Sequence, residues 1–496
     1  MEKISKEGKK EIEKLRKEAI ESAERLPKKI IKPSFDVIDN LRCTGDIHFS
    51  IPSKGIEYEP ARLIKHQSGG FKLEIDNLIN EIEEPCDIVL IINEIRYIVS
   101  DVYFQFSGGT ISRNTHNDLF SGTLGSAAFL HSLNLDTENK EDSYRRCVLP
   151  IGESIIGSFV QTEWYRTEWN NGAGLVILSI NDISFDFYQA KYGSDYFFVV
   201  DSKIEVSFDI FSDICNAITL AFGFLSANFY QNEAYFLSSD DESFEIISRV
   251  EYKQLRESIL MCGAYNPIIS NPYQYSKDDK IIEKVGTSIR VFNAAEFSSL
   301  CNRLFSDENY QELILLIIES NAGSLILQPA GYAVALEKIT NIVVEENGGL
   351  KPIPDKRLSS KFLKAMREVL KSMKEEINEV GNEDSIVILG KNIDKMNSPT
   401  NRDKLTKPFN IYEIDLDAKD QEAIANRNNF LHGRGLNVAE GTDLFNEVWE
   451  TSMRLNGMIN KLILKHLGYS GYVINHVKRY EVALGKEIGK ELFEKI

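Results

Sequence analysis

The spacing of apolar side chains divides the chain. From about residue 31 to residue 275, apolar and β-branched residues alternate with polar ones in short runs, for example at 47–51, 71–75 and 174–188. A period of two is typical of β-strands. After residue 285 the apolar positions recur every three or four residues, which predicts amphipathic helices. We therefore expect an α+β fold in two parts: a β-rich, sandwich or barrel-like N-terminal region followed by an all-α helical bundle.

This pattern divides the chain into four segments. Residues 1–30 predict an N-terminal amphipathic helix, 31–280 a β-rich sensor or regulatory domain, 285–470 a helical domain and 471–496 a C-terminal tail. One helix, at 211–229, interrupts the β-rich segment. The helical domain contains six amphipathic stretches, at 293–305, 310–320, 329–346, 360–377, 418–432 and 443–467.

Composition narrows the choice of partners and compartment. The net charge of −18 means that the protein as a whole repels nucleic acid, so any contact with RNA requires a local basic patch. The six cysteines include no C-x-x-C pair, which argues against a zinc ribbon or a disulfide scaffold. The most apolar stretch, 214–229, is short and contains polar residues, so it suits a buried core helix better than a membrane span. We expect a cytoplasmic protein that contacts no membrane.

Several familiar catalytic motifs are absent from the sequence. There is no G-x-x-x-x-G-K-[ST], no G-x-G-x-x-G after a strand, no G-x-S-x-G and no H-E-x-x-H. We therefore expect neither a cofactor nor a metal ion. Trp164 and Trp169 lie five residues apart, and packing in or on a strand explains them better than a stacking platform for bases or sugars.

The most informative string is R-N-N-F-L-H-G, residues 427–433. It lies near the end of a helix that can start around Asp417 and stop where Gly433 offers a left-handed C-cap. Asn428 and His432 are four residues apart and share a face, with Arg427 beside them. Polar side chains in an otherwise apolar stripe need partners or a purpose. They could bridge neighbouring helices, or they could bind phosphate.

This string resembles the motif of the HEPN superfamily, whose ribonuclease members carry R-x(4 to 6)-H, often as R-N-x-x-x-H, in a bundle of four or five helices. The order of a long helix, a basic helix and then the motif helix is similar to Apea-like HEPN proteins of bacteria. A β-rich region before the bundle is similar to ApeA-type anti-phage abortive-infection proteins. The resemblance implies a metal-independent endoribonuclease that is active as a homodimer through the HEPN bundle. It assigns catalysis to Arg427 and His432, with Asn428 as their polar companion.

The residue types suit this chemistry on their own. RNA carries its own nucleophile, the 2′-OH, so a nuclease needs proton transfer and stabilisation of charge on the phosphoryl oxygens. Histidine, with a pKa near 6.5, can move a proton at cellular pH. The guanidinium of Arg427 matches phosphate oxygens with two parallel hydrogen bonds. We expect a 2′,3′-cyclic phosphate and a 5′-OH as products.

A basic helix precedes the motif and could attract RNA, for example tRNA. Residues 351–374 hold eight Lys or Arg and two acids, a local charge of +6. An apolar stripe on this helix contains Phe362, Leu363, Met366, Val369, Leu370 and Met373. The predicted RNA-binding side chains on the opposite side are Lys361, Lys364, Lys371 and Lys374. Five further cations fall in the predicted loop before the motif: Lys391, Lys395, Arg402, Lys404 and Lys407.

Two other functions remain open. A non-catalytic HEPN scaffold that binds a nucleotide or a protein partner would need the same helical bundle. A carbohydrate- or ligand-binding β-domain with a helical dimerisation module would not need the string at 427–433. In the leading hypothesis, the β-rich region has one of three roles. It senses a trigger, for example one of phage origin, it restrains the bundle, or it selects the RNA.

Overall fold

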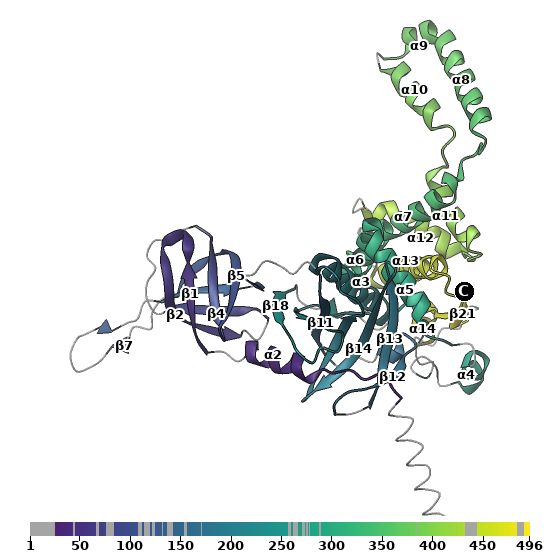
Figure 1. The fold of residues 1–496 in the computed structure, drawn as a ribbon. Coiled ribbons are helices and arrows are strands. Elements are labelled where there is room, and N and C mark those ends of the chain that lie inside the picture. Colours follow the sequence, from purple (N-terminus) through teal and green to yellow (C-terminus); the bar gives the residue numbers. More distant parts are fainter. Residues whose placement is uncertain are drawn as a thin grey trace, which may run out of the picture. The chain divides into compact units, whose positions relative to one another are not determined.

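The structure of the chain is a computed structural model (Figure 1). It describes residues 25–496 except 43–44, 66–68, 76–83, 108–111, 114–119, 122–124, 131, 136–141, 153–155, 170, 256–258, 261–265, 270–272, 274–275, 277, 287–288, 383, 432–443 and 484–490. Most of the predicted N-terminal helix therefore lies outside the described residues. The structure confirms the two-part α+β layout, with antiparallel sheet in the N-terminal half and helices in the C-terminal half.

The chain forms two compact units. The first contains residues 1–261 and 291–307, and the second contains 262–290 and 308–496. The sequence pattern grouped 291–307 with the helical domain, but α5 (Ala294–Ser306) packs on strand β13 (Asn171–Ile180) and helix α3 (Phe208–Ser226) of the first unit. An amphipathic helix shows which of its faces is buried but not which neighbour covers it.

The first unit is built on one antiparallel sheet, in which fifteen strands are described. In sheet order they are β12 (Glu163–Arg166), β13 (Asn171–Ile180), β14 (Ile183–Tyr192), β15 (Asp195–Ser202), β11 (Tyr144–Ile151), β17 (Glu233–Ser239), β18 (Arg249–Gln254), β10 (Ser132–Leu135), β5 (Ile95–Val102), β4 (Cys86–Ile92), β1 (Gly45–Ile51), β2 (Ile56–Lys65), β3 (Phe71–Ile75), β9 (Gly125–Leu130) and β6 (Phe104–Ser107). Two short pairs stand apart: β7 (Ser112–Arg113) with β8 (Phe120–Ser121), and β16 (Asn228–Phe229) with β19 (Ile259–Leu260). Asn181 and Asp182 both have positive φ, the geometry that a tight turn between β13 and β14 requires.

Two more helices cover this sheet. Helix α2 (Lys32–Arg42) buries Phe35, Ile38 and Leu41 in the core of the sheet. Helix α3 (Phe208–Ser226) corresponds to the helix predicted at 211–229. It begins after Ser207, whose side chain accepts from the Ile210 amide, and ends at Ala227, which has a φ of 56°. Among the described residues α3 alone is long and apolar enough to cross a membrane, and most of it is buried in the first unit as a core helix.

A buried charge cluster holds the segment before α2 against the sheet. Arg146 donates to both carboxylate oxygens of Asp201, at 2.6 and 2.9 Å, and to the Ile30 carbonyl at 2.6 Å. Lys29 pairs with Asp186 and lies 3.4 Å from Asp201. Because each of these buried charges has a partner, the cluster avoids the cost of burying an isolated ion.

The second unit is a helical bundle around α7 (Gln328–Glu346). Helix α7 packs on α6 (Glu308–Ala322), α11 (Asn401–Ile411), α12 (Ala418–Leu431) and α13 (Leu444–His466). Its apolar residues at spacings of three and four, Tyr332, Leu336, Ile339 and Val343, are fully buried. Gly331 allows the close approach of α6, because a Cβ there would lie 2.0 Å from Ser320 Oγ.

Smaller elements complete the unit. Helices α8 (Lys356–Ser372), α9 (Lys374–Val380) and α10 (Ser385–Lys395) follow α7 and pack on one another. The predicted tail, 471–496, contains β20 (Tyr472–Ile474), α14 (His476–Ala483) and β21 (Phe493–Lys495), and β20 pairs with β21. Helix α4 (Asp279–Gly286) contributes Val285 to a small apolar cluster with this pair.

Candidate functional site

Helix α12 carries the motif and is anchored at its first turn. Asp417 accepts a hydrogen bond from the Asp420 amide at 2.6 Å, and Asp420 accepts from the Asp417 amide at 3.1 Å. Reciprocal bonds of this kind satisfy amides that have no partner within the helix. The expected start near Asp417 is therefore confirmed.

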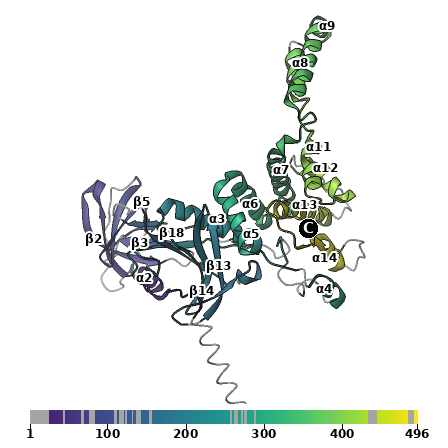
Figure 2. The ribbon, with the colours of Figure 1, turned by 45° about the vertical axis from the view of Figure 1, so that its right-hand side comes forward.

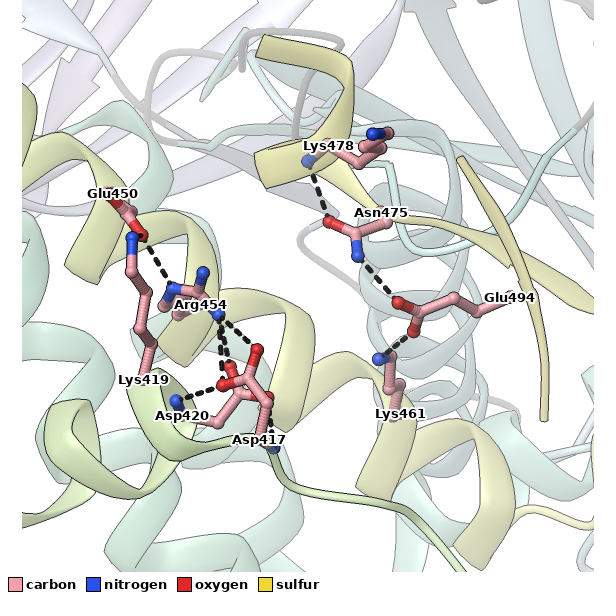
Figure 3. Close-up of polar contacts among 9 residues, drawn as sticks. All are labelled: Asp417, Lys419, Asp420, Glu450, Arg454, Lys461, Asn475, Lys478 and Glu494. Atoms are coloured by element: carbon pink, nitrogen blue, oxygen red, sulfur yellow. Dashed lines mark hydrogen bonds and ion pairs between the residues drawn. The ribbon is translucent and has the colours of Figure 1, made fainter. Parts of the chain in front are cut away.

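Arg454 of α13 ties this first turn to the bundle (Figure 3). Its Nη1 lies 2.8 Å from Asp420 Oδ1 and 3.2 Å from Asp417 Oδ2, while its Nε donates to Glu450 at 3.0 Å. Lys419 also donates to Glu450, at 2.9 Å. Burial alone would raise the pKa of Glu450, but Lys419 and Arg454 outweigh it and lower that pKa. The negative charge of the helix start is thus compensated by α13.

Arg427 anchors the other end of α12. Its Nε donates to Glu337 Oε1 of α7 at 2.9 Å, and its Nη1 donates to the Ile424 carbonyl at 3.1 Å. The guanidinium is therefore held in a fixed position against α7.

The other motif residues are only partly described. His432 lies outside the described residues. Asn428 belongs to α12, but its side chain is not among those described. Near the end of α12 the apolar residue Leu431 is 36% exposed, whereas Arg427 is buried. Pairing with Glu337 and with a backbone carbonyl allows the arginine to take the buried position.

All four predicted RNA-binding lysines are exposed. Lys361, Lys364 and Lys371 lie on α8, and Lys374 is the first residue of α9. A hollow of about 570 Å³ lies beside the start of α8, with four cations, Lys351, Lys356, Lys364 and Arg367, and one acid, Glu368, in its lining. This excess of positive charge fits a phosphate group.

A buried asparagine shapes that hollow. Asn397 accepts from the Ile353 amide at 2.7 Å and donates to the Ile353 carbonyl at 3.0 Å and to Ser359 Oγ at 2.6 Å. The segment before α8 is thereby fixed to the end of α10.

The structure does not bring the lysines and Arg427 together. Helix α8 packs on α9 and α10, whereas α12 packs on α7 and α13. Figures 1 and 2 show α8 extending away from α12 within the second unit. An RNA bound to both would have to span the distance between them.

The expected loop before the motif is wrong. Lys391 and Lys395 lie on α10, and Arg402, Lys404 and Lys407 lie on α11. The sequence contains a signal for α11, because Thr400 and Asp403 form a reciprocal cap at its start. Aspartate takes the place of the usual glutamate in this motif.

A second hollow, of about 620 Å³, is lined by loop residues 413–417, α13 and the β20–β21 pair. Its cations, Lys461, Lys465 and Lys495, are outnumbered by five acids, Glu413, Asp415, Asp417, Glu491 and Glu494. Lys461 is already paired with Glu494, which also accepts from Asn475 (Figure 3). This hollow therefore suits a phosphate less well than the one beside α8.

One polar cluster in the bundle has no motif in the sequence. Tyr412 Oη lies 2.9 Å from His466 Nδ1, and Glu346 Oε2 lies 3.5 Å from His466 Nε2. The three residues come from the ends of α11, α13 and α7. In the sequence His466 is the last residue but one of the amphipathic stretch at 443–467, and only the fold brings its two partners to it.

The structure also shows where the two tryptophans and four of the cysteines lie. Trp164 is 60% exposed on β12, and Trp169 lies beyond the end of that strand. Cys86, Cys147, Cys215 and Cys301 are buried and free. Within the described part of the chain, no group of three or more His, Cys, Asp or Glu side chains is placed to hold a metal ion.

Comparisons with known proteins found no similar protein. No family profile, no curated protein and no solved structure matches the chain. The candidate site therefore rests on its own residues: an anchored arginine near the end of α12 and a separate basic surface on α8.

Proposed function

We propose that this protein is a HEPN-type, metal-independent endoribonuclease. The observation that carries the proposal is the placement of Arg427. It lies in the last turns of a helix that α13 holds at one end and α7 at the other, and His432 follows five residues later in the chain. A cation held in place and a histidine five residues later in the chain would supply the two elements that phosphoryl transfer to the RNA 2′-OH requires.

The proposed roles follow from the chemistry of the side chains. His432 takes the proton of the 2′-OH, or gives one to the departing 5′ oxygen. Arg427 donates to the phosphoryl oxygens as negative charge develops on them. Asn428 orients the histidine or the phosphate. The 2′ oxygen forms a bond to phosphorus as the bond to the 5′ oxygen breaks, so the upstream fragment ends in a 2′,3′-cyclic phosphate and the other fragment carries a 5′-OH.

A homodimer through the HEPN bundle would supply two histidines, one as base and one as acid. In this proposal the protein is cytoplasmic and acts in abortive infection or as a toxin. The sheet of the first unit would then respond to a trigger, such as a phage product, or select the RNA.

The exposed lysines and the hollow beside α8 support a contact with RNA. Its phosphates would meet Lys361, Lys364, Lys371 and Lys374, although the chain as a whole carries a charge of −18. Salt-dependent binding through a few phosphate contacts is the expected behaviour of such a patch.

One observation favours a second function, a scaffold that binds a nucleotide or a protein without catalysis. Arg427 is buried and already paired with Glu337, so it has a complete structural role without RNA. In that case the string at 427–433 stabilises the bundle and cleaves nothing.

Cleavage of labelled RNA by the purified chain in EDTA separates the two functions. Single-stranded RNA and tRNA are the substrates, and the expected products carry 2′,3′-cyclic phosphate and 5′-OH ends. If neither RNA is cleaved by a folded, RNA-binding protein, the scaffold is favoured. If cleavage requires an added divalent ion, the metal-independent mechanism is wrong.

A further inference from the structure

Helices α8, α9 and α10 form a projecting hairpin, residues 356–395, that extends away from the rest of the second unit (Figures 1 and 2). Of the seventeen residues of α8, all of them described, none is buried. Helices in water normally bury an apolar face, because intrinsic helix propensity alone rarely stabilises a helix. The hairpin therefore presents more apolar surface than its own two-helix contact covers.

The inner contact uses only part of the apolar stripe. Leu363, Met366 and Leu370 form the half-buried row of α8, and a Cβ on Gly390 of α10 would lie 4.0 Å from Leu370 Cδ2. On α10, Ile393 is buried. Arg367 and Asp394 form an ion pair along one edge of it. This contact fixes which faces of the two helices point outward.

A second apolar row remains exposed on α8. Leu358, Phe362, Val369 and Met373 are 57%, 37%, 52% and 44% exposed. Because an α-helix has 3.6 residues per turn, these four positions fall within an arc of about 60°. Around the helix axis, they lie about a quarter of a turn before the inner row, which is Leu363, Met366 and Leu370. The row is therefore a separate face of α8.

Helix α10 continues the same face. Leu389 of α10 and Met396, the residue after its end, are 39% and 48% exposed. Around the helix axis, both lie before Ile393, the buried residue of α10. Because α8 and α10 run in opposite directions, the two exposed rows emerge on the same side of the hairpin. We call these six residues the apolar face. Lys364, Arg367 and Lys371 lie about half a turn away from it on α8, so the cations occupy the opposite side.

Charge changes sign along the hairpin. Residues 351–374, which form its base and α8, hold eight Lys or Arg and two acids. Residues 375–390, which form its tip, hold five acids and no Lys or Arg. Among them, Glu375, Glu376 and Glu379 are exposed on α9. The base and α8 are therefore basic, and the tip beyond Lys374 is acidic.

We propose that the apolar face binds the same face of a second copy of this chain, with the two hairpins antiparallel. A twofold axis across the helices places each acidic tip beside the basic base of its partner, so each favourable contact occurs twice. The pairing buries both apolar faces and forms a four-helix arrangement of a common kind. The pairing leaves Lys364 and Lys371 accessible to RNA. The proposed pairing does not depend on whether the chain is a nuclease.

The charges favour a second copy over a lipid surface. A helix that lies on an anionic membrane is attracted through its basic residues along its whole length. Here the tip carries only acids, which an anionic membrane repels. In an antiparallel pair of hairpins, the same acids meet lysine and arginine.

Sedimentation of the full chain tests the apolar contact. We expect a concentration-dependent association whose dissociation constant rises at least tenfold in the Phe362→Glu/Val369→Glu protein. The matched control is Ile204→Glu/Ile246→Glu, at exposed apolar residues of the first unit, and it should associate like the wild type. Far-UV circular dichroism establishes that all three proteins are folded.

Charge reversal tests the antiparallel arrangement. Reversing the tip (Glu375→Lys/Glu379→Lys) or the base (Arg357→Glu/Lys361→Glu) should weaken self-association, because like charges then meet. Mixing these two proteins should restore association, since each tip again meets an opposite base. A chain that carries all four changes should also self-associate.

Three results would overturn the proposal. They are a wild-type chain that stays monomeric across the concentration range, an apolar-face variant that associates like the wild type, and reversed proteins that do not recover on mixing. Flotation with phosphatidylserine vesicles that requires Phe362 and Val369, with self-association unchanged, would assign the face to lipid instead. RNA cleavage is not a readout here, so the nuclease can fail without affecting this result.

Discussion

Arg427 Nε donates to Glu337 Oε1 across 2.9 Å and joins the motif helix α12 to the central helix α7. Glu337 lies nine residues after Gln328, the first residue of α7, in a helix whose other face is buried in the bundle. The contact holds the guanidinium in one orientation. In the proposed nuclease, a donor held in this way would need no rearrangement at the moment of reaction. A purely structural arginine would make the same contact, so substitutions must separate the two roles.

Removing the histidine is the first such substitution. His432→Ala should leave the bundle folded and lower RNA cleavage by roughly 100- to 10,000-fold, because general acid–base transfer contributes about that much. The measurement is the initial rate on labelled RNA in EDTA. His48→Ala, at an exposed histidine of β1, is the matched control and should cleave normally. Equal rates in both variants would contradict the histidine mechanism.

Changing the arginine to lysine tests the geometry of phosphate recognition. Arg427→Lys should lower the cleavage rate nearly as much as Arg427→Ala, because an ammonium cannot form two parallel hydrogen bonds. The free energy of unfolding should fall by about 1 kcal/mol or less, since the Glu337 carboxylate is partly exposed to water. Arg62→Lys, at an exposed arginine of β2, is the control. A lysine variant with most of the wild-type rate would leave Arg427 a structural role only.

The basic surface on α8 should determine the salt dependence of RNA binding. Changing Lys361, Lys364, Lys371 and Lys374 to Gln should weaken binding and reduce the slope of log affinity against log salt. The expected reduction is about 0.7 for each phosphate of single-stranded RNA that the variant no longer neutralises. Stability should change by less than about 0.5 kcal/mol per residue, because all four side chains are exposed.

Binding is measured with His432→Ala protein, so that the RNA stays intact. The control carries four Lys→Gln changes at other exposed lysines: Lys32, Lys54, Lys280 and Lys495. An equal reduction in slope for both sets would show that only net charge matters. An unchanged slope in the α8 variant would place the RNA elsewhere.

The sequence predicts the helix at α8 but not the partner of its stripe. Phe362, Leu363, Met366, Val369, Leu370 and Met373 form one stripe in the sequence. In the structure Leu363, Met366 and Leu370 are half-buried, and the others stay exposed. Periodicity reports the side of a helix that is apolar, while the width of the contact depends on the neighbour. The sequence does not predict helix α10, because four consecutive apolar residues, 386–389, obscure its helical period.

The motif shows the same limit. The sequence places the start of α12 near Asp417, and this position is correct. It contains no sign that Arg427 is buried, because Glu337 is ninety residues away in the chain. A long-range ion pair leaves no periodic signal, whereas the reciprocal cap at Asp417 and Asp420 is local and can be read from spacing.

The last prediction concerns the pH dependence of stability in the second unit. His476, at the start of α14, is buried, and its Nε2 lies 3.2 Å from the Asn266 carbonyl. A carbonyl oxygen only accepts, so Nε2 carries the proton and donates. Nδ1 is buried and has no partner among the described residues. Burial lowers the pKa of His476 to about 4; the Asn266 hydrogen bond opposes this shift and Arg479 adds to it.

The sign of the pH effect follows from that shift. Unfolded histidine has a pKa near 6.5, so protonation favours the unfolded chain between about pH 6.5 and 4. The stabilising contribution is complete above pH 6.5 and disappears as the pH falls toward 4. A difference of about 2.5 pKa units corresponds to roughly 3 kcal/mol at most.

Urea unfolding at pH 7.5, 6.5, 5.5 and 4.5 measures this contribution. The chain has three tryptophans, so a Trp164→Phe/Trp169→Phe background leaves Trp449 of α13 as the reporter for the second unit. His476→Gln keeps an amide that can donate to Asn266 but cannot titrate, so its unfolding free energy should fall less steeply below pH 6.5. His48→Gln, at an exposed histidine, should behave like the background protein. If His476→Gln loses stability as steeply as the background protein, another group controls acid unfolding, and His476 does not change protonation when the unit unfolds.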